Sequence, residues 1–536
     1  MTPEGKTVLE WIATNREELS RDHAGIWALH EPAWREYRAS QWYVDRLRRE
    51  GFEVEAGGAG MPTSFTASWV SPAGDGPHIA AYAEYDAVPG NSQDNVPFEK
   101  PRPGMSRWAP GFTEPHSAVG IASFGGLLAA KAAMERHGIK GTLRYFGEPA
   151  ENMCGGKVFH AAKGYYDGLD AVIAWRTSPL PATVNTCALD TLCGCFWSKV
   201  YTFEHKEVYG APVRAAAGSA GPPGAARSSG ALDAMCLMYT TSKYLREAML
   251  PHAGSWALNE AILANGSATA DNAPPRIAQL QYSWRCPTVE MAQRILDVLD
   301  SNADYVARVT NTSWRSDWVS RTRPGLPNHA LAEIAYANFE KVGPPSWEDD
   351  AREFACSCQR SLSIEPMVEP FADGLDRLIP PEIAEAAVRA DLPAWQKHFG
   401  SDDYVEYTWH APTVRILVAR PRLAPPEPGY VYPRWVTAAM GGVPEIVDPV
   451  MLTASRVIGL TIVDLLTSPD KLARCKSEFD ERTQGGIRGK GWIAPLLGPE
   501  IDPPVDFPWP EYVTTARGHG WCIPVNGEAG HLTGKE

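Results

Sequence analysis

The stretch Gly111–Lys157 constrains the fold most, because it predicts two loops of ionisable side chains separated by one helix and one strand. It reads GFTEPHSAVGIASFGGLLAAKAAMERHGIKGTLRYFGEPAENMCGGK. Its small-residue run predicts a helix over 118–136 that ends at His137-Gly138, and residues 142–146 predict a strand. If this strand is parallel to its neighbours, both loops lie at the carboxyl edge of a sheet, where open α/β folds place their sites.

The two loops bring one histidine and three carboxylates towards one another. Glu114 and His116 precede the predicted helix, whereas Glu148, Glu151 and Asn152 follow the predicted strand. This combination suits metal binding or acid–base chemistry. Ordinary solvated loops also carry such acids, so the spacing alone leaves both interpretations open.

Two further strands are predicted to end in ionisable residues. The apolar run 78–85 is typical of a buried parallel strand, and Asp86 follows it directly. The run 171–175 is followed by Arg176. A turn-stabilising role explains Asp86 equally well. Both residues are therefore candidates for the same sheet edge, with a structural role as the alternative for Asp86.

Composition narrows the class of protein. The 536 residues suffice for two domains, or for one domain with large insertions. A net charge of −14 and a pI near 5.5 argue against a nucleic-acid groove. We find no apolar run long enough to span a membrane and no N-terminal signal, so we expect no membrane contact and a cytoplasmic location. The 10 cysteines form no C-x-x-C pair, which favours free buried thiols over a structural zinc site.

The character of the chain changes near residue 190. Strand-like and helix-like runs between residues 191 and 312 predict an inserted α+β domain. Residues 1–190 and 313–536 are then the two parts of one catalytic domain, and the second part carries a Gly- and Pro-rich C-terminal tail.

The sequence resembles the aminoacylase–carboxypeptidase family of metal-dependent amide hydrolases, in its p-aminobenzoyl-glutamate hydrolase-like branch. The stretches that carry the resemblance lie in family order over most of the chain: HEPAWREYRASQWYVDRLRREGFEVE, GMPTSF, AEYDAVPG, GEPAENMCGGK, ALDAM and SDDYVEYTWHAP. The resemblance implies an α/β catalytic domain of the zinc-exopeptidase type, with a mostly parallel sheet flanked by helices. It also implies an inserted α+β dimerisation or lid domain, and hence a homodimer.

The resemblance implies a site that departs from the family pattern. The family loop His-Gly-Cys-Gly-His-Asn aligns with residues 112–117, so that His116 is kept and Glu114 replaces the metal-binding cysteine. Glu151 matches the family's general base. Asn152 stands in place of a ligand glutamate. Because these positions no longer carry the family's metal ligands, we do not expect the family's two-zinc centre in this chain.

Four other positions extend this comparison. Arg176 and Pro433 stand where the family has metal-binding histidines. Arg214 aligns with a histidine that reaches the substrate across the dimer, and Asn272 aligns with a substrate-contacting asparagine. We therefore expect Arg176, Asn152, Arg214 and Asn272 to bind the substrate. Because arginine cannot serve as a ligand and repels cations, its presence argues against a second metal ion.

Three functions remain open at this point. The first is a hydrolase that cleaves an amide or related C–N bond in a small anionic molecule, with Glu151 as the general base. Here Glu114, His116 and Glu148 would bind one divalent ion, Mn, Fe or Zn, and Asp86 would orient His116. The second is a metal-free hydrolase, lyase or cyclase that uses Glu151 and His116 for acid–base chemistry. The third is a non-catalytic homologue that has kept the fold.

Overall fold

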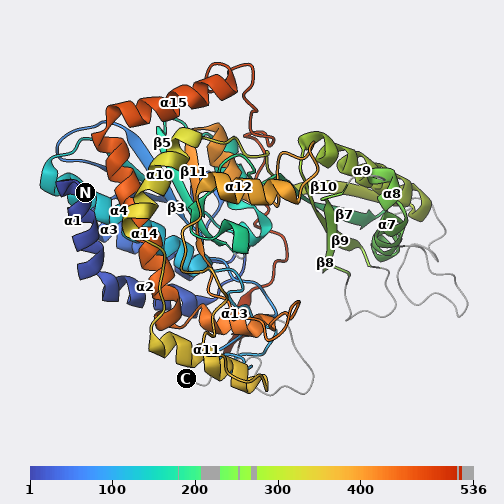
Figure 1. The fold of residues 1–536 in the computed structure, drawn as a ribbon. Coiled ribbons are helices and arrows are strands. Elements are labelled where there is room, and N and C mark those ends of the chain that lie inside the picture. Colours follow the sequence, from blue (N-terminus) through green and yellow to red (C-terminus); the bar gives the residue numbers. More distant parts are fainter. Residues whose placement is uncertain (179, 207–229, 251–253, 267–274, 516–517, 522–536) are drawn as a thin grey trace, which may run out of the picture.

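The described residues form two large sheets that belong to two parts of the molecule (Figure 1), and a two-stranded hairpin near the C-terminal end. The computed structural model describes residues 1–178, 180–206, 230–250, 254–266, 275–515 and 518–521. Arg214 and Asn272, which the sequence assigns to the substrate, lie outside these described residues.

The larger sheet has seven strands in the order β1-β2-β4-β3-β5-β11-β6. The strands are β1 (Glu53–Ala56), β2 (Phe65–Val70), β3 (His78–Ala83), β4 (Thr142–Gly147), β5 (Ala171–Ser178), β6 (Thr186–Cys187) and β11 (Thr413–Ala419). The four central strands, β4, β3, β5 and β11, run parallel to one another, and β1, β2 and β6 pair antiparallel at the two edges. The predicted α/β class is therefore confirmed, although the sheet is mixed, with a parallel centre and antiparallel edges.

Both faces of this sheet are buried, which explains why its central strands are apolar along their whole length. Successive side chains of a strand point to opposite faces. In β3, Ile79 and Ala81 join the main core, whereas Ala80 and Tyr82 join a second cluster on the other face. The sheet therefore separates a large helical core from a smaller cluster that contains Tyr82.

Eleven described helices surround this sheet in the catalytic part. They are α1 (Pro3–Thr14), α2 (Arg16–Leu29), α3 (Tyr37–Arg49), α4 (His116–His137), α5 (Gly156–Ala162), α10 (His329–Val342), α11 (Asp349–Ser361), α12 (Pro381–Ala390), α13 (Arg434–Met440), α14 (Pro444–Thr467) and α15 (Pro469–Thr483). Short 3-10 turns lie at η1 (Gly58–Gly60), η2 (Glu151–Met153), η3 (Pro181–Thr183) and η4 (Asp403–Trp409). Helix α4 ends at Gly138 in the left-handed conformation (φ 63°), as the sequence predicts.

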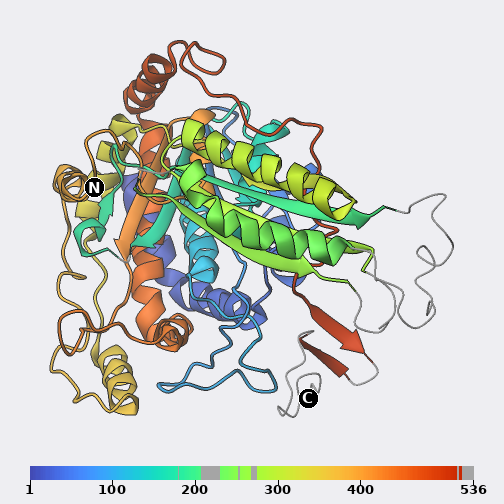
Figure 2. The same ribbon diagram turned by 90° about the vertical axis from the view of Figure 1, so that its right-hand side faces the viewer.

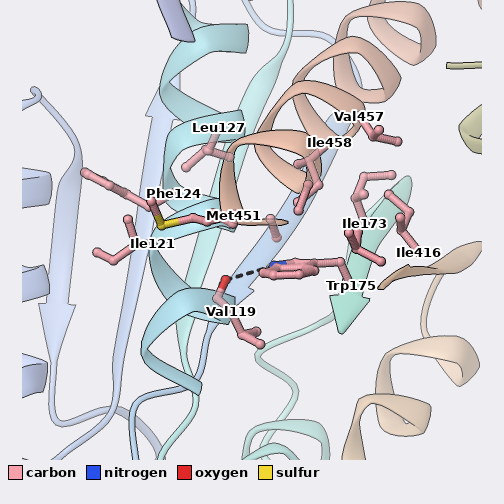
Figure 3. Packing of buried hydrophobic residues seen from close by; sticks show 14 of the residues in the cluster. Val119, Ile121, Phe124, Leu127, Ile173, Trp175, Ile416, Met451, Val457 and Ile458 are labelled. Atoms are coloured by element: carbon pink, nitrogen blue, oxygen red, sulfur yellow. Dashed lines mark hydrogen bonds between the residues drawn. The ribbon is translucent and has the colours of Figure 1, made fainter. Parts of the chain in front are cut away.

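Helices α4 and α14 cross at close range in the main core (Figure 3). A Cβ on Gly126 would lie 2.8 Å from Ile458 and from the carbonyl oxygen of Ser455, so the approach requires glycine there. The small residues of the predicted helix thus serve packing. Trp175 of β5 donates from Nε1 to the Val119 carbonyl at 2.9 Å, which ties α4 to the sheet beside the site.

The same two helices, α4 and α14, are long and apolar enough to cross a membrane by length and composition alone. Within the molecule, however, 89% and 78% of their most apolar windows are buried. Their apolar character is accounted for by packing against the sheet and against each other.

The second part of the molecule is a four-stranded antiparallel sheet in the order β10-β7-β9-β8, covered on one face by helices (Figure 2). Its strands are β7 (Cys195–His205), β8 (Ala257–Ala264), β9 (Ile277–Cys286) and β10 (Thr312–Arg321), and its described helices are α7 (Ala231–Tyr244), α8 (Arg246–Met249) and α9 (Val289–Thr310). Strand β10 pairs with β7, so this sheet runs on to Arg321, past the predicted boundary at residue 312. The buried residues of this part form a core of their own.

The segment after α15 joins the two parts of the molecule. Arg323, just after β10, is fully buried; it pairs with Glu406 and donates to the Ile493 carbonyl at 2.8 Å. Leu497 and Trp509 pack in one cluster with Val200 of β7. The described tail therefore runs along the junction and ends in the hairpin β12 (Tyr512–Thr515) and β13 (Gly518–Trp521).

Candidate active site

The carboxyl ends of β3, β4 and β5 bring ionisable side chains to one edge of the larger sheet. Glu84 and Asp86 follow β3, Glu151 and Asn152 lie in the turn after β4, and Arg176 lies near the end of β5. Parallel strands end at the same edge, so residues far apart in the sequence meet there. The first turn of α4 and the approach to η4 supply the remaining groups.

His116 is the first residue of α4 and is fully buried. Its Nδ1 lies 2.8 Å from Asp86 Oδ1, and the other Asp86 oxygen accepts from the backbone and side-chain amides of Asn152, each at 2.9 Å. The predicted contact between Asp86 and His116 is thus present, and it fixes the ring so that Nε2 faces the site. Although burial alone would lower the pKa of His116, Glu151 and Asp86 raise it well above its usual value.

Glu151 occupies the centre of the site. Its Oε2 lies 2.7 Å from His116 Nε2, and its Oε1 accepts a short hydrogen bond from Arg176. Burial favours a raised pKa, but Arg176 and His116 outweigh it and hold the pKa of the Glu151 carboxyl well below its usual range. Glu151 is therefore ionised at neutral pH and lies within hydrogen-bonding distance of a group that can exchange a proton with it.

Arg176 is surrounded by acidic groups. Its NH1 lies 3.0 Å from Asp402 Oδ2 and 3.6 Å from Glu84 Oε2, in addition to the bond to Glu151. Its NH2 lies 3.5 Å from Glu114 Oε2. Four carboxylates thus face one guanidinium, which makes it the main counter-ion of the site.

Glu114 lies at the rim of the site. Its side chain is 37% exposed and pairs with Arg420 NH1 at 3.3 Å and with Arg176. Burial favours a raised pKa, but Arg420 and Arg176 hold the pKa of this carboxyl below its usual range. Two arginines thus neutralise the residue that the sequence assigns to the metal.

Glu148 belongs to a separate network. Its carboxylate contacts His160 Nδ1 at 2.8 Å and accepts from the hydroxyls of Tyr166 and Tyr407 at 2.7 and 2.5 Å. All three partners are buried on the face of the sheet opposite α4. The predicted ligand set of Glu114, His116 and Glu148 is therefore not assembled, because Glu148 follows β4 directly and turns to that other face.

Two other groups in the described part of the chain bring possible ligand atoms within 4.8 Å of one another. One group is Glu84, His116 and Glu151; the other is Glu84, Glu151, Asp402 and Asp403. In the first group, Glu84 Oε2 is buried and has no hydrogen-bond partner among the described residues. This oxygen lies 3.9 Å from His116 Nε2 and 3.6 Å from Arg176 NH1. The donor set of His116 Nε2 and carboxylate oxygens fits one divalent cation and supports metal use.

Three residues of these groups were not identified as functional from the sequence. Glu84 lies in AEYD two residues before Asp86, where strand alternation is a weak signal. Asp402 and Asp403 lie in SDDYVEY, more than 200 residues from the loops that they meet, and Asp402 bridges Arg176 and Arg415. The sequence shows that these residues are acidic, but it does not show that their side chains lie beside Glu151.

A cavity of about 770 Å³ opens over Glu151, between the two parts of the molecule. Its lining includes Arg285 of β9 together with residues of the catalytic part. Six arginines and three acidic residues contribute to it: Arg176, Arg285, Arg415, Arg420, Arg422, Arg434, Glu114, Glu151 and Asp402. The cavity is thus a cationic pocket inside a protein of net charge −14.

Comparisons with known proteins agree with the resemblance. No family model matches the sequence. The chain is 26% identical over 490 residues to a subunit of the p-aminobenzoyl-glutamate hydrolase of Escherichia coli strain K12, a match that covers 88% of this chain and 94% of that protein. It is 27% identical over 364 residues to the Xaa-Arg dipeptidase of Mus musculus, covering 64% of this chain and 72% of that protein.

The fold also aligns with solved structures. A dinuclear metal-binding peptidase of the M20 family from Bacillus subtilis aligns over 85% of this chain and 99% of its own, with a TM-score of 0.45 and 14% identity. An aminobenzoyl-glutamate utilization protein from Klebsiella pneumoniae aligns over 83% of this chain and 98% of its own, with a TM-score of 0.47 and 14% identity. The two sequence relatives are hydrolases by name, and they support an enzyme of the amidohydrolase and peptidase type that is similar to the p-aminobenzoyl-glutamate hydrolase.

Proposed function

We propose that this protein hydrolyses an amide or related C–N bond in a small anionic molecule, with Glu151 as the general base. The observation that carries the proposal is the position of Glu151, ionised and in contact with His116, on the wall of an arginine-rich cavity. Arginine binds carboxylates through two parallel hydrogen bonds, so such a pocket favours an acidic substrate. No ion pair joins Arg422 or Arg434 to a carboxylate among the described residues, which leaves both cations for a ligand.

The contact between Arg176 and Glu151 suggests how substrate binding and proton transfer are linked. A general base works best when its pKa lies near the operating pH, yet Arg176 keeps the pKa of Glu151 low. An anionic group of the substrate that binds Arg176 would weaken its bond to Glu151. The pKa of Glu151 would then rise, and the carboxylate would accept a proton from the attacking water more readily.

His116 completes the acid–base pair in this proposal. Held by Asp86 and charged through its raised pKa, it can donate a proton from Nε2 to the leaving nitrogen. A divalent ion bound by Glu84, His116 and Glu151 would replace the proton on His116 Nε2, so that His116 would no longer be the acid, and would instead supply Lewis acidity towards the scissile carbonyl. We propose Mn, Fe or Zn as its identity, since mixed oxygen and imidazole ligands suit these metals.

The test of the proposed function is a panel of N-acyl amino acids, assayed for release of the free amine. The panel includes p-aminobenzoyl-glutamate, the substrate in the name of the bacterial relative, and neutral amides of the same size. We expect hydrolysis of acidic members and much weaker hydrolysis of neutral ones. Equal turnover of both classes, or none of any member with and without added Mn²⁺, would contradict the proposal.

Metal binding by the wild-type protein is expected to depend on His116 and on pH. His116→Ala should abolish tight Mn²⁺ binding, measured by equilibrium dialysis, whereas Glu148→Gln should keep it, because Glu148 contacts the Tyr166 and Tyr407 network instead. The ion must displace the proton from His116, whose pKa is raised, so Mn²⁺ affinity should increase as the pH rises. Unchanged affinity in His116→Ala would remove this histidine from the ligand set.

A metal-free acid–base enzyme in the same pocket is the second candidate. It is favoured by the guanidinium of Arg176, which lies 3.2 Å from His116 Nε2 and repels a cation there. The two candidates differ in one measurement. Turnover that survives exhaustive chelation and returns to no higher value with Mn²⁺ identifies the metal-free enzyme.

We also propose that the protein is a homodimer formed through its inserted domain. Large apolar side chains are exposed there, among them Tyr244 (80%), Val309 (77%) and Tyr305 (65%). Light scattering behind a sizing column should give about twice the chain mass of 58.5 kDa at micromolar concentration. The double variant Tyr305→Asp and Val309→Asp should run as a monomer, and a monomeric wild type would contradict the proposal.

A further inference from the structure

Lys157 of α5 is a fully buried lysine that no step of the proposed reaction uses. Its Nζ donates to Glu84 Oε1 at 2.9 Å and to Asp403 Oδ1 at 2.7 Å, and it lies 4.8 Å over the ring of Tyr82. It does not contribute to the lining of the large cavity. Its partners are therefore the buried carboxylates beneath the site.

The carboxylates around Lys157 form a potential cation site. Glu84, Glu151, Asp402 and Asp403 each have one ligand oxygen within 4.8 Å of the others. Glu84 Oε2 and Asp403 Oδ2 are buried without a hydrogen-bond partner among the described residues. Oxygen-rich groups of this kind suit Mn²⁺ and other hard divalent ions.

Side-chain cations already neutralise this group from two sides. Lys157 holds one oxygen of Glu84 and one of Asp403. Arg176 holds Glu151 and Asp402. The second oxygens of Glu84 and Asp403 accept no hydrogen bond from the described residues, although Glu84 Oε2 lies 3.6 Å from Arg176 NH1. A divalent ion bound to these oxygens would lie close to the ammonium group of Lys157.

We propose that Lys157 is a fixed cation in a four-carboxylate site that would otherwise bind a divalent metal ion, and that it limits this chain to one metal ion. The ammonium group belongs to the chain itself, so it neutralises Glu84 and Asp403 without the uptake of an ion from solution. Glu84 keeps its second oxygen turned towards His116 Nε2, at 3.9 Å. We therefore expect one divalent metal ion at the site, next to the ammonium group of Lys157. The inference goes beyond the proposed function, since it holds whether or not Glu151 is the base.

The experiment counts bound Mn²⁺ per chain by equilibrium dialysis, without substrate, in the wild type and in Lys157→Met. We expect at most one ion in the wild type and about one ion more in Lys157→Met. Lys163→Met is the matched control, because Lys163 caps the same helix, is 22% exposed and pairs weakly with the exposed Asp502, so its count should equal that of the wild type. Two ions in the wild type, or no gain in folded Lys157→Met, would overturn the proposal.

Two further measurements keep the test decisive. The double variant Lys157→Met and Asp403→Asn should lose the extra ion, and an extra ion that persists would lie elsewhere and contradict the proposal. If Lys157→Met does not fold in metal-free buffer, Mn²⁺ should restore the folded state by replacing the missing cation. Absence of such a rescue would equally overturn it. Because none of these measurements involves turnover, their failure is distinct from failure of the proposed function.

Discussion

Glu151→Gln is expected to lower turnover at least about a hundredfold, the lower end of the usual contribution of a general base. Glutamine keeps the shape of the side chain and can still bond to Arg176 and His116, but it cannot accept a proton. A hundredfold loss corresponds to about 2.7 kcal/mol of transition-state stabilisation. The measurement is kcat on the best acidic member of the N-acyl amino acid panel.

Glu114→Gln is the matched control for this substitution. Glu114 also lies on the cavity wall and also pairs with Arg176, but its side chain is 37% exposed and its nearest contacts are to arginines. We expect Glu114→Gln to change KM more than kcat. Similar melting temperatures for the wild type and both variants would exclude unfolding as the cause. Wild-type kcat in Glu151→Gln would remove Glu151 from the mechanism.

The sequence predicted the sheet edge because the signals involved are local. An apolar run followed by a charged residue indicates a buried strand and its approximate end: Asp86 follows β3, and Arg176 lies within β5, two residues before its last residue Ser178. Parallel order then brings these ends together without any knowledge of side-chain packing. For the same reason the contact between Asp86 and His116 could be predicted, since both residues lie next to strand or helix ends.

The direction of a side chain in a loop is not a local property, and for Glu148 the structure differs from the expectation that its carboxylate lies beside His116. Glu148 and Glu151 lie three residues apart in one turn, yet Glu148 contacts the tyrosines on one face of the sheet and Glu151 contacts His116. No periodicity applies to such a turn, so the sequence could not distinguish the two carboxylates. Glu84, and not the predicted ligand Glu148, has a possible ligand atom within 4.8 Å of those of His116 and Glu151.

Contacts between residues far apart in the chain could not be predicted from the sequence either. Lys157 ends the GEPAENMCGGK stretch, but nothing in that stretch indicates that its ammonium group pairs with Asp403, 246 residues further on. Lys157 pairs with this carboxylate because it is buried. Its burial depends on the packing of α5 against η4, which the local sequence does not show. The inserted domain shows the same limit, since β10 was excluded from it although its pairing with β7 places it there.

Arg176 is expected to be the residue whose loss damages the site most. Four carboxylates face its guanidinium, and its side chain is 14% exposed. Arg176→Met leaves these acids without their shared cation. Breaking a buried pair in this way typically costs about 3–5 kcal/mol. We expect the melting temperature to fall by several degrees or more in a calorimetric scan.

Arg420→Met provides the comparison. Arg420 also lines the cavity, but its acidic partner is the more exposed Glu114, which keeps Arg176 as a second counter-ion. Since Glu114 is partly exposed and keeps a second cation, the loss of Arg420 should cost less than the loss of Arg176, and this variant should melt closer to the wild type. Equal destabilisation by the two substitutions would show that Arg176 has no special structural role.

Arg176→Lys separates the structural role from substrate binding. Lysine keeps the charge and hence much of the attraction to Glu151 and Asp402, but it cannot form the two-pronged bond to a carboxylate. If the substrate binds Arg176, KM for the acidic substrate should rise in this variant while the loss in melting temperature stays well below that of Arg176→Met. If Arg176 serves the acidic cluster alone, the melting temperature should fall while KM of the folded enzyme stays unchanged. Because the neutral amides of the panel do not need the guanidinium, a KM that rises equally for acidic and neutral substrates would contradict the proposed role of Arg176 in recognising the anion.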